Sequence, residues 1–141
     1  MAKILGIDFG DRRTGFSISD DLCIIASPIG TFTASGMREV VDYTQSLVQK
    51  YNVSKIVLGL PLNMDGTEGE RAEKSRKLAG VLNKVTGLEI VLKDERLTTV
   101  SALRVLDEAS IKGDKRKNTV DTMSAQIILQ SYLDAIKIKE N

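Results

Sequence analysis

The stretch "ILGIDFGDRRTGFSISD" (residues 4–20) decides the fold, because it joins an apolar run to an alternating run through a short polar turn. The apolar run is typical of a buried strand. Residues 14–20 alternate polar and apolar side chains and place Phe16 and Ile18 on one face, which predicts a half-buried strand. Residues 10–13 form the turn, so the stretch predicts two neighbouring strands of one sheet.

Asp8 is the unusual residue of this stretch, because moving a carboxylate out of water is costly unless it gains a partner. In a structural interpretation, Asp8 only ends the first strand and caps the turn that begins at Gly10. In a functional interpretation, the strand carries Asp8 to the carboxyl edge of the sheet, where open α/β folds bind ligands. A hard cation beside the carboxylate would compensate its charge.

The rest of the chain alternates between strand and helix patterns. In order, the patterns predict a strand at 23–32, a helix at 35–51, a strand at 55–60, a helix at 67–86, a strand at 88–93, a helix at 98–109, a mobile basic loop at 111–118 and a last helix from 119. Pro28 indicates an edge or a bulge in the third strand. Three antiparallel strands followed by βαβ crossovers predict a mixed five-stranded sheet with helices on both faces.

Capping residues and helical spacing predict where the helices begin and how they pack. Ser35 is the predicted cap of the first helix, and Thr67 with Glu70 forms a capping box for the second. The predicted core face of the second helix consists of Ala72, Ser75, Leu78, Ala79 and Leu82. The predicted core face of the last helix consists of Val120, Met123, Ile127, Ile128, Tyr132, Leu133 and Ile136.

Composition limits the chemistry that the chain can perform. The 141 residues include no histidine and one cysteine, Cys23, for which a buried apolar role is predicted. Imidazole metal sites and Ser-His-Asp or Cys-His triads are therefore excluded, and carboxylates that suit Mg²⁺ remain. Residues 71–117 hold 12 Lys/Arg against 7 Asp/Glu, an excess of +5 that suits a polyanion. The apolar runs are too short for a membrane span or a signal peptide, so we expect a cytoplasmic protein.

Two further acidic positions lie where they can join Asp8. Asp94 and Glu95 follow the fifth predicted strand, and they point to opposite faces if that strand continues, so only one of them can reach Asp8. Asp121 lies in the first turn of the last predicted helix, where an acid also interacts favourably with the helix dipole. Each acid has an ordinary surface role when taken alone. The three placements together predict one carboxylate site.

Four motifs resemble, in order and spacing, those of the YqgF family of Holliday junction resolvases, which belongs to the RNase H-like superfamily. They are "GIDFGDRRTGFSISD" (6–20), "GLPLNMDGTEGERA" (59–72), "DERLTT" (94–99) and "DTMSAQIILQSYLD" (121–134), and the resemblance covers residues 4–134. The resemblance implies a single RNase H-like nuclease domain over 1–141 that matures the 5′ end of the precursor of 16S ribosomal RNA.

The resemblance also implies which residues carry the site. By motif match the catalytic and metal-binding acids are Asp8, Glu95 and Asp121. The family pattern usually has an acid just after the fourth strand, where this chain has Pro61 and Leu62, so Asp94 stays as the reserve for Glu95. We expect two Mg²⁺ or Mn²⁺ ions about 4 Å apart, bridged by Asp8. The expected phosphate contacts are Arg12, Arg13, Arg71, Arg96, Lys115, Arg116 and Lys117.

Other interpretations stay open at this stage. The chain could bind nucleic acid without turnover, as a ribosome assembly factor. "GIDFG" (6–10) also resembles the first phosphate loop of actin-like ATPases, although one domain of this size would have to pair with a second copy to enclose a nucleotide. Backbone contacts do not distinguish RNA from branched DNA, and the sequence is compatible with a monomer or a homodimer.

Overall fold

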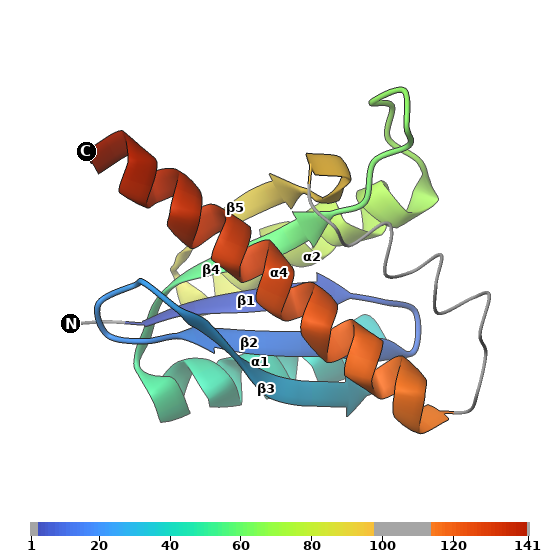
Figure 1. Ribbon diagram of the computed structural model, residues 1–141. Coiled ribbons are helices and arrows are strands. Elements are labelled where there is room, and N and C mark those ends of the chain that lie inside the picture. Colours follow the sequence, from blue (N-terminus) through green and yellow to red (C-terminus); the bar gives the residue numbers. More distant parts are fainter. Residues whose placement is uncertain (1–2, 98–113, 141) are drawn as a thin grey trace.

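The computed structural model describes residues 3–97 and 114–140, with side chains placed for residues 3–96 and 122–137 (Figure 1). Its centre is one five-stranded sheet in the order β3-β2-β1-β4-β5. The strands are β1 Lys3–Phe9, β2 Arg13–Ser19, β3 Ala26–Thr33, β4 Val53–Leu60 and β5 Glu89–Asp94. β1, β2 and β3 form antiparallel pairs, while β4 and β5 run parallel to β1. The predicted meander with parallel crossovers is confirmed, and β1 is the central strand.

Helices cover both faces of this sheet, as predicted. α1 (Met37–Tyr51) and α2 (Glu70–Thr86) pack on one face, and α4 (Asp114–Glu140) crosses the other face diagonally (Figure 1). A short 3-10 helix, η1 (Glu95–Leu97), follows β5. The helix predicted at 98–109 lies outside the described residues.

Alternation along β1 divides the core into two layers. Leu5 and Ile7 point into the layer beneath α1 and α2, whereas Ile4 points into the layer beneath α4. The predicted core face of α2 is confirmed, since all five of its residues are buried. β2 is buried on both faces, contrary to the prediction of a half-buried strand, because α4 covers the face that sequence alternation assigned to solvent.

The last helix starts earlier than predicted. α4 begins at Asp114, so residues 114–118 are helical and only part of the predicted basic loop can be a loop. Asp121 consequently lies two turns inside α4 rather than in its first turn. The buried side chains of α4 are Ser124, Ala125, Ile128, Leu129 and Leu133, while Met123 is exposed. The prediction overlooked the small residues Ser124 and Ala125, because it selected large apolar side chains at helical spacing.

Two predicted caps and the role of Cys23 also differ from the structure. Neither α1 nor α2 has a side-chain cap, because glycines occupy both N-cap positions and Thr67 bonds to Asp65 instead. β3 begins at Ala26, so Cys23 lies in the preceding turn, half-buried and with a positive φ of 56°. The edge and bulge indicated by Pro28 are confirmed: β3 is an edge strand and its register shifts at this point. Within the described ranges, no helix is both long and apolar enough to cross a membrane.

Candidate active site

Asp8 is buried at the carboxyl end of the central strand, on the face that α4 covers. Its side chain is only 3% exposed. Because Ile7 points toward α1 and α2, the next residue along the strand points toward α4. The structure gives Asp8 at least one interaction within the protein, so the carboxylate is not isolated.

Glycines on both neighbouring strands make room around Asp8. Gly15 of β2 is directly opposite Asp8 in the antiparallel register. On the other side, Gly59 of β4 lies one residue beyond the Ile7–Leu58 pair and is therefore level with Asp8. Neither glycine was singled out from the sequence as part of the site. Their position level with the buried acid depends on strand register, which the sequence of a single segment does not show.

Glu95 occupies the space that Gly59 leaves open. A Cβ atom on Gly59 would lie 2.6 Å from Oε1 of Glu95 and 2.6 Å from Cδ1 of Ile128, which belongs to α4. The carboxylate of Glu95 therefore lies on the same face as Asp8, one strand away, and the residue is only 3% exposed. The turn of η1 directs Glu95 into this position, because the chain leaves the strand geometry directly after Asp94.

Asp94 has a different role from Glu95. Its carboxylate accepts hydrogen bonds from the backbone N–H of Arg96 and from Nε and Nη2 of the same side chain, at 2.8–3.3 Å. These bonds from Arg96 hold the pKa of Asp94 below its ordinary value. Because Asp94 is already bound in this way, the geometry favours Glu95 over Asp94 as the partner of Asp8.

The backbone of α4 brings residue 121 to the level of Asp8. The hydroxyl groups of Thr31 and Thr122 are 2.7 Å apart, and Thr31 is in register with Gly15 and so with Asp8. One turn further along α4, Ala125 lies against Gly6, two residues before Asp8 on β1. The side chain of Asp121 lies outside the described residues, so its part in the site stays a prediction.

Ser124 adds an unpaired polar atom to this face. It is fully buried, and its hydroxyl has no hydrogen-bond partner among the residues that the structure describes. It lies one turn before Ile128, which contacts the Gly59 position. Among the residues whose side chains are described, no three Cys, Asp or Glu side chains group closely enough to hold a metal ion. The described part of the site is therefore a pair of carboxylates, Asp8 and Glu95, to which Asp121 would add a third.

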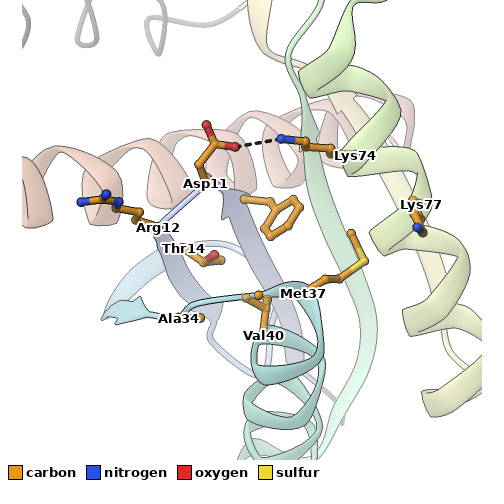
Figure 2. Close-up of a pocket in the computed structure, with 11 residues that line it drawn as sticks. Asp11, Arg12, Thr14, Ala34, Met37, Val40, Lys74 and Lys77 are labelled. Carbon is orange, nitrogen blue, oxygen red and sulfur yellow. Dashed lines mark hydrogen bonds and ion pairs between the residues drawn. The ribbon is translucent and has the colours of Figure 1, made fainter.

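The predicted phosphate-binding residues surround the site unevenly. Arg71 lines a pocket of about 340 Å³ together with Glu95. Its guanidinium takes part in none of the ion pairs among the described residues. Arg12 extends from the β1–β2 turn, pointing away from α2 (Figure 2). Arg13 is half-buried and engaged within the protein. The side chains of residues 115–117 lie outside the described part, although their backbone forms the start of α4.

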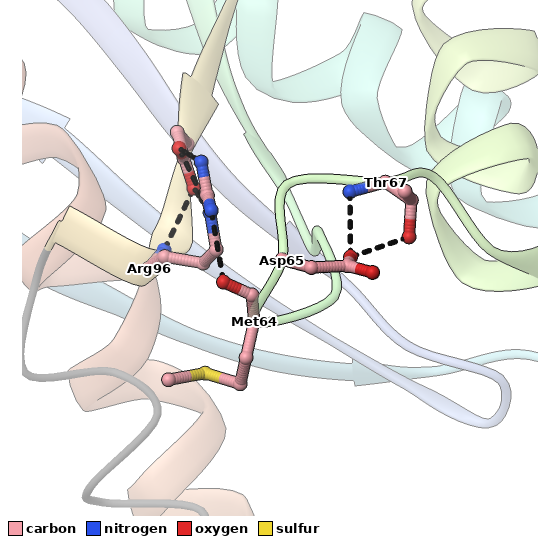
Figure 3. Close-up of polar contacts among 5 residues, drawn as sticks. Met64, Asp65, Thr67 and Arg96 are labelled. Carbon is pink, nitrogen blue, oxygen red and sulfur yellow. Dashed lines mark hydrogen bonds and ion pairs between the residues drawn. The ribbon is translucent and has the colours of Figure 1, made fainter.

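Arg96 braces a loop beside the site. In addition to its bonds with Asp94, it donates from Nη1 to the carbonyl of Met64 at 3.2 Å (Figure 3). The guanidinium also lies 3.3 Å from where a Cβ of Gly66 would be, and Gly66 has a positive φ of 89°. Its donors thus serve protein contacts, and the structure favours a positioning role for Arg96 over the predicted phosphate contact.

Replacing Arg96 with Met is expected to loosen the loop at 62–68 and to lower stability modestly, because a charged hydrogen-bonded pair is lost. Since the folded pKa of Asp94 is depressed, the pair stabilises the fold above the unfolded pKa, about 3.9, and loses this effect as pH falls through the lower folded pKa. The stability difference from wild type should therefore be constant above about pH 5 and shrink below about pH 4.

Denaturant titrations from pH 7 to pH 3 measure this difference, and hydrogen exchange at the amides of Asn63 and Gly66 reports on the loop. Arg38→Met, an exposed change on α1, is the control and should alter neither quantity. A stability difference that does not depend on pH would contradict the assigned role of the Asp94–Arg96 pair.

The strand order, the helices on both faces and the buried acids at the carboxyl edge define an α/β domain of the RNase H-like class. Solved structures share this fold: Thermus thermophilus RuvC in complex with a Holliday junction substrate matches with a TM-score of 0.62 and 11% identity, over 97% of this chain and 96% of that one. The Holliday junction resolvase of fowlpox virus matches with a TM-score of 0.54 and 11% identity, over 94% and 99% of the two chains.

The family is shown by sequence. The family model described as "RuvX: Holliday junction resolvase" matches residues 2–135, and the chain belongs to this family. A "Putative pre-16S rRNA nuclease" of Bacillus cytotoxicus is 44% identical over 135 residues, covering 94% of this chain and 98% of that protein. A protein of the same name from Agathobacter rectalis is 42% identical over 135 residues, covering 94% of both. The sequence-based prediction of a nuclease of the resolvase family is thereby confirmed.

Proposed function

We propose that this protein is a metal-dependent nuclease that processes the 5′ end of the 16S ribosomal RNA precursor. The observation that carries the proposal is the pair of buried carboxylates, Asp8 and Glu95, on one face at the carboxyl edge of the sheet. Glycines keep the neighbouring positions free of side chains. The relatives named as pre-16S rRNA nucleases support this substrate over branched DNA, the substrate that the family description names.

The donor set fits a hard divalent cation. Carboxylate oxygens are the ligands that Mg²⁺ and Mn²⁺ prefer, and the chain has no histidine to offer a softer alternative. Asp8, Glu95 and Asp121 would hold one or two such ions, and the unpaired hydroxyl of Ser124 is a nearby polar atom. Bound ions would supply Lewis-acid activation of water and of the scissile phosphate. The buried carboxylates hold the ligand geometry fixed, and α4 shields this face from bulk water.

The pocket beside Glu95 is a suitable place for the phosphates that flank the cut. It is formed by the loop after β4 and by the start of α2, where Gly69 leaves the first amides without a side-chain cap. Free amides and the helix dipole attract phosphate, and Arg71 adds a cation at the same pocket. The few aromatic residues, 4% of the chain, argue against recognition by base stacking. These features support an enzyme that recognises the sugar-phosphate backbone and the shape of the nucleic acid.

A cleavage assay tests the proposal. Wild type and Asp8→Asn are incubated with Mg²⁺ or Mn²⁺ and four substrates: a precursor RNA with its 5′ extension, the mature RNA end, a four-way DNA junction and a linear duplex. We expect metal-dependent cutting of the precursor by wild type alone. Cutting of the junction only would replace the RNA substrate with branched DNA. Binding without any cutting would favour the assembly-factor interpretation.

Arg71→Ala is expected to weaken binding of the precursor and to reduce the slope of log K against log salt by about 0.7–0.9, the value for one phosphate contact. Arg76→Ala is the matched control, since Arg76 lies on the same helix but bonds Glu68 through Nε at 2.6 Å and Nη2 at 2.7 Å. Binding is measured in Ca²⁺ to prevent cleavage. Equal slopes for the two variants would remove Arg71 from the substrate interface.

The remaining proposals concern the chain as a whole. We propose that residues 1–141 act as one nuclease domain in the cytoplasm, as a monomer or a homodimer. Analytical ultracentrifugation with and without the precursor RNA measures the oligomeric state. Lys115, Arg116 and Lys117 are proposed to contact phosphates from the first turn of α4, the same helix that carries Asp121.

A further inference from the structure

A second pocket lies on the opposite face of the sheet from the carboxylates, and of its lining residues only Arg12 is also a predicted phosphate contact of the nuclease. Its volume is about 290 Å³, and its walls are the turn after β1, the start of α1 and one side of α2 (Figure 2). We call it the α1–α2 pocket. Phe9, the residue after Asp8, contributes to its wall, so the two sites lie back to back across the sheet.

Apolar side chains form much of the lining of the α1–α2 pocket. Phe9 and Met37 are partly buried and reach the pocket surface, and Val40 and Ala34 complete this part. An aromatic ring beside a thioether suits a flat ring system in a ligand. Gly36 also lines the pocket, and a Cβ at that position would meet no atom within 4 Å, so the space beside it is open.

Lysine side chains from α2 give one side of the pocket a positive charge. Lys74 and Lys77 are three residues apart on α2 and therefore lie on the same side of the helix. Nζ of Lys74 is 3.4 Å from a carboxylate oxygen of Asp11 (Figure 2) and 3.7 Å from one of Glu70. No hydrogen bond or ion pair is described for Lys77. Lys77 is thus the lysine of this pair that no described carboxylate contacts, whereas Lys74 lies against two.

Thr14 provides an unused hydrogen-bonding group in the wall. It is only 1% exposed, it lines the pocket, and none of the hydrogen bonds described for the protein involves its hydroxyl. It pairs with Phe9 across β1 and β2, so both side chains lie on the pocket's face of the sheet. The start of α1, which has no side-chain cap, adds unpaired backbone amides to the same wall.

We propose that the α1–α2 pocket binds a nucleoside phosphate, with the base against Phe9 and Met37 and the phosphate near Lys77, Thr14 and the start of α1. Small-ligand sites occupy about 300–1,000 Å³, so a pocket of about 290 Å³, just below this range, accommodates at most one nucleotide and not a longer segment. The same chemistry is offered by a free mononucleotide and by a single nucleotide of a bound strand, and the test separates these two sources.

The test compares wild type with Lys77→Ala, Thr14→Val and a control, Lys84→Ala, which lies on α2 away from the pocket. Calorimetry measures binding of AMP, adenosine and inorganic phosphate. A parallel titration in Ca²⁺ measures binding of a 5′-phosphorylated single-stranded RNA. Loss of one charge-assisted contact should weaken AMP or RNA binding by about tenfold in Lys77→Ala, with a smaller loss in Thr14→Val. The control should bind as wild type does.

The melting temperature separates a binding role of Thr14 from a structural one. Thr14→Val keeps the shape of the side chain and removes a hydroxyl that has no described partner in the protein, so its melting temperature should not fall. AMP binding that depends on Lys77 and Thr14 identifies a mononucleotide site. RNA binding that depends on them without AMP binding identifies a strand contact. If neither ligand distinguishes the variants from the control, the proposal is wrong.

Failure of this proposal can be told apart from failure of the nuclease proposal. Asp8 faces the other side of the sheet, so Asp8→Asn should bind AMP with wild-type affinity even though it does not cleave. Conversely, Lys77→Ala should retain metal-dependent cleavage at saturating substrate if the pocket is only a binding site. Loss of AMP binding in Asp8→Asn would mean that the two pockets are not independent.

Discussion

Asp8→Asn is expected to reduce cleavage by well over a hundredfold, because even residues that only orient metal ligands cost about 10–100-fold when they are replaced. Asp8 is buried between Gly15 and Gly59. In the described part of the site, no other side chain can supply the charged oxygen that the asparagine lacks. The asparagine has the same shape, so the fold should persist. The measurement is the single-turnover rate on precursor RNA at saturating metal.

The same substitution is expected to leave the metal-free protein as stable as wild type, or slightly more stable. Asp8 and Glu95 place two carboxylates on one buried face, and removing one charge relieves their repulsion. Wild type should melt at a higher temperature when Mn²⁺ is added, because a ligand that binds only the folded state stabilises it. Asp8→Asn should lose most of this increase.

Asp42→Asn, an exposed change on α1, controls for the loss of a surface charge. It should keep both the cleavage rate and the stabilisation by Mn²⁺. Wild-type cleavage by Asp8→Asn, together with an unchanged response to Mn²⁺, would show that Asp8 only ends the strand, as the structural interpretation of the sequence holds.

The sequence predicted the sheet well because its signals are local. Continuous apolar runs mark β1 and β4, which are buried on both faces, and also β5, although this edge strand is only partly buried. Pro28 marks the edge and bulge of β3. The start of α4 was harder to predict, since residues 114–118 are polar and basic and carry no apolar period. A helix that extends beyond its core contact has no hydrophobic signal at that end.

The sequence predicted only those site residues that can be recognised by their residue type and their place at a strand end. Asp8 and Glu95 stand out as acids at strand ends, and the structure places both on one buried face. The role of Gly59 depends on register between two strands, and that of Arg96 depends on a loop more than 30 residues away, at Met64. Such relations become visible only when strands are paired, so periodicity along one segment could not reveal them.

Gly6 allows α4 to approach the sheet, and this approach sets the distance between the body of α4 and β1. A Cβ on Gly6 would lie 2.4 Å from Oγ of Ser17, 2.7 Å from Cβ of Leu129 and 3.1 Å from the carbonyl oxygen of Ala125. Ser17 in turn donates a hydrogen bond of 2.8 Å to that carbonyl. These groups belong to β2 and to the body of α4, so they cannot turn aside as a flexible side chain could.

Gly6→Ala is therefore expected to destabilise the protein by about 3 kcal/mol, at the upper end of the usual cost of overpacking, because α4 must move away from β1. The shift would also separate residue 121 from Asp8, so cleavage should fall at temperatures where the variant is still folded. Gly80→Ala is the matched control, because Gly80 lies on the exposed side of α2 and a Cβ added there would meet no atom within 4 Å. This substitution should stabilise the protein by up to about 1 kcal/mol. Denaturant unfolding and single-turnover cleavage at 15 °C measure both effects. Equal stability of the two variants would mean that α4 tolerates a wider spacing from β1 than the Gly6 contact implies. Full activity of Gly6→Ala would show that this spacing does not affect the active site.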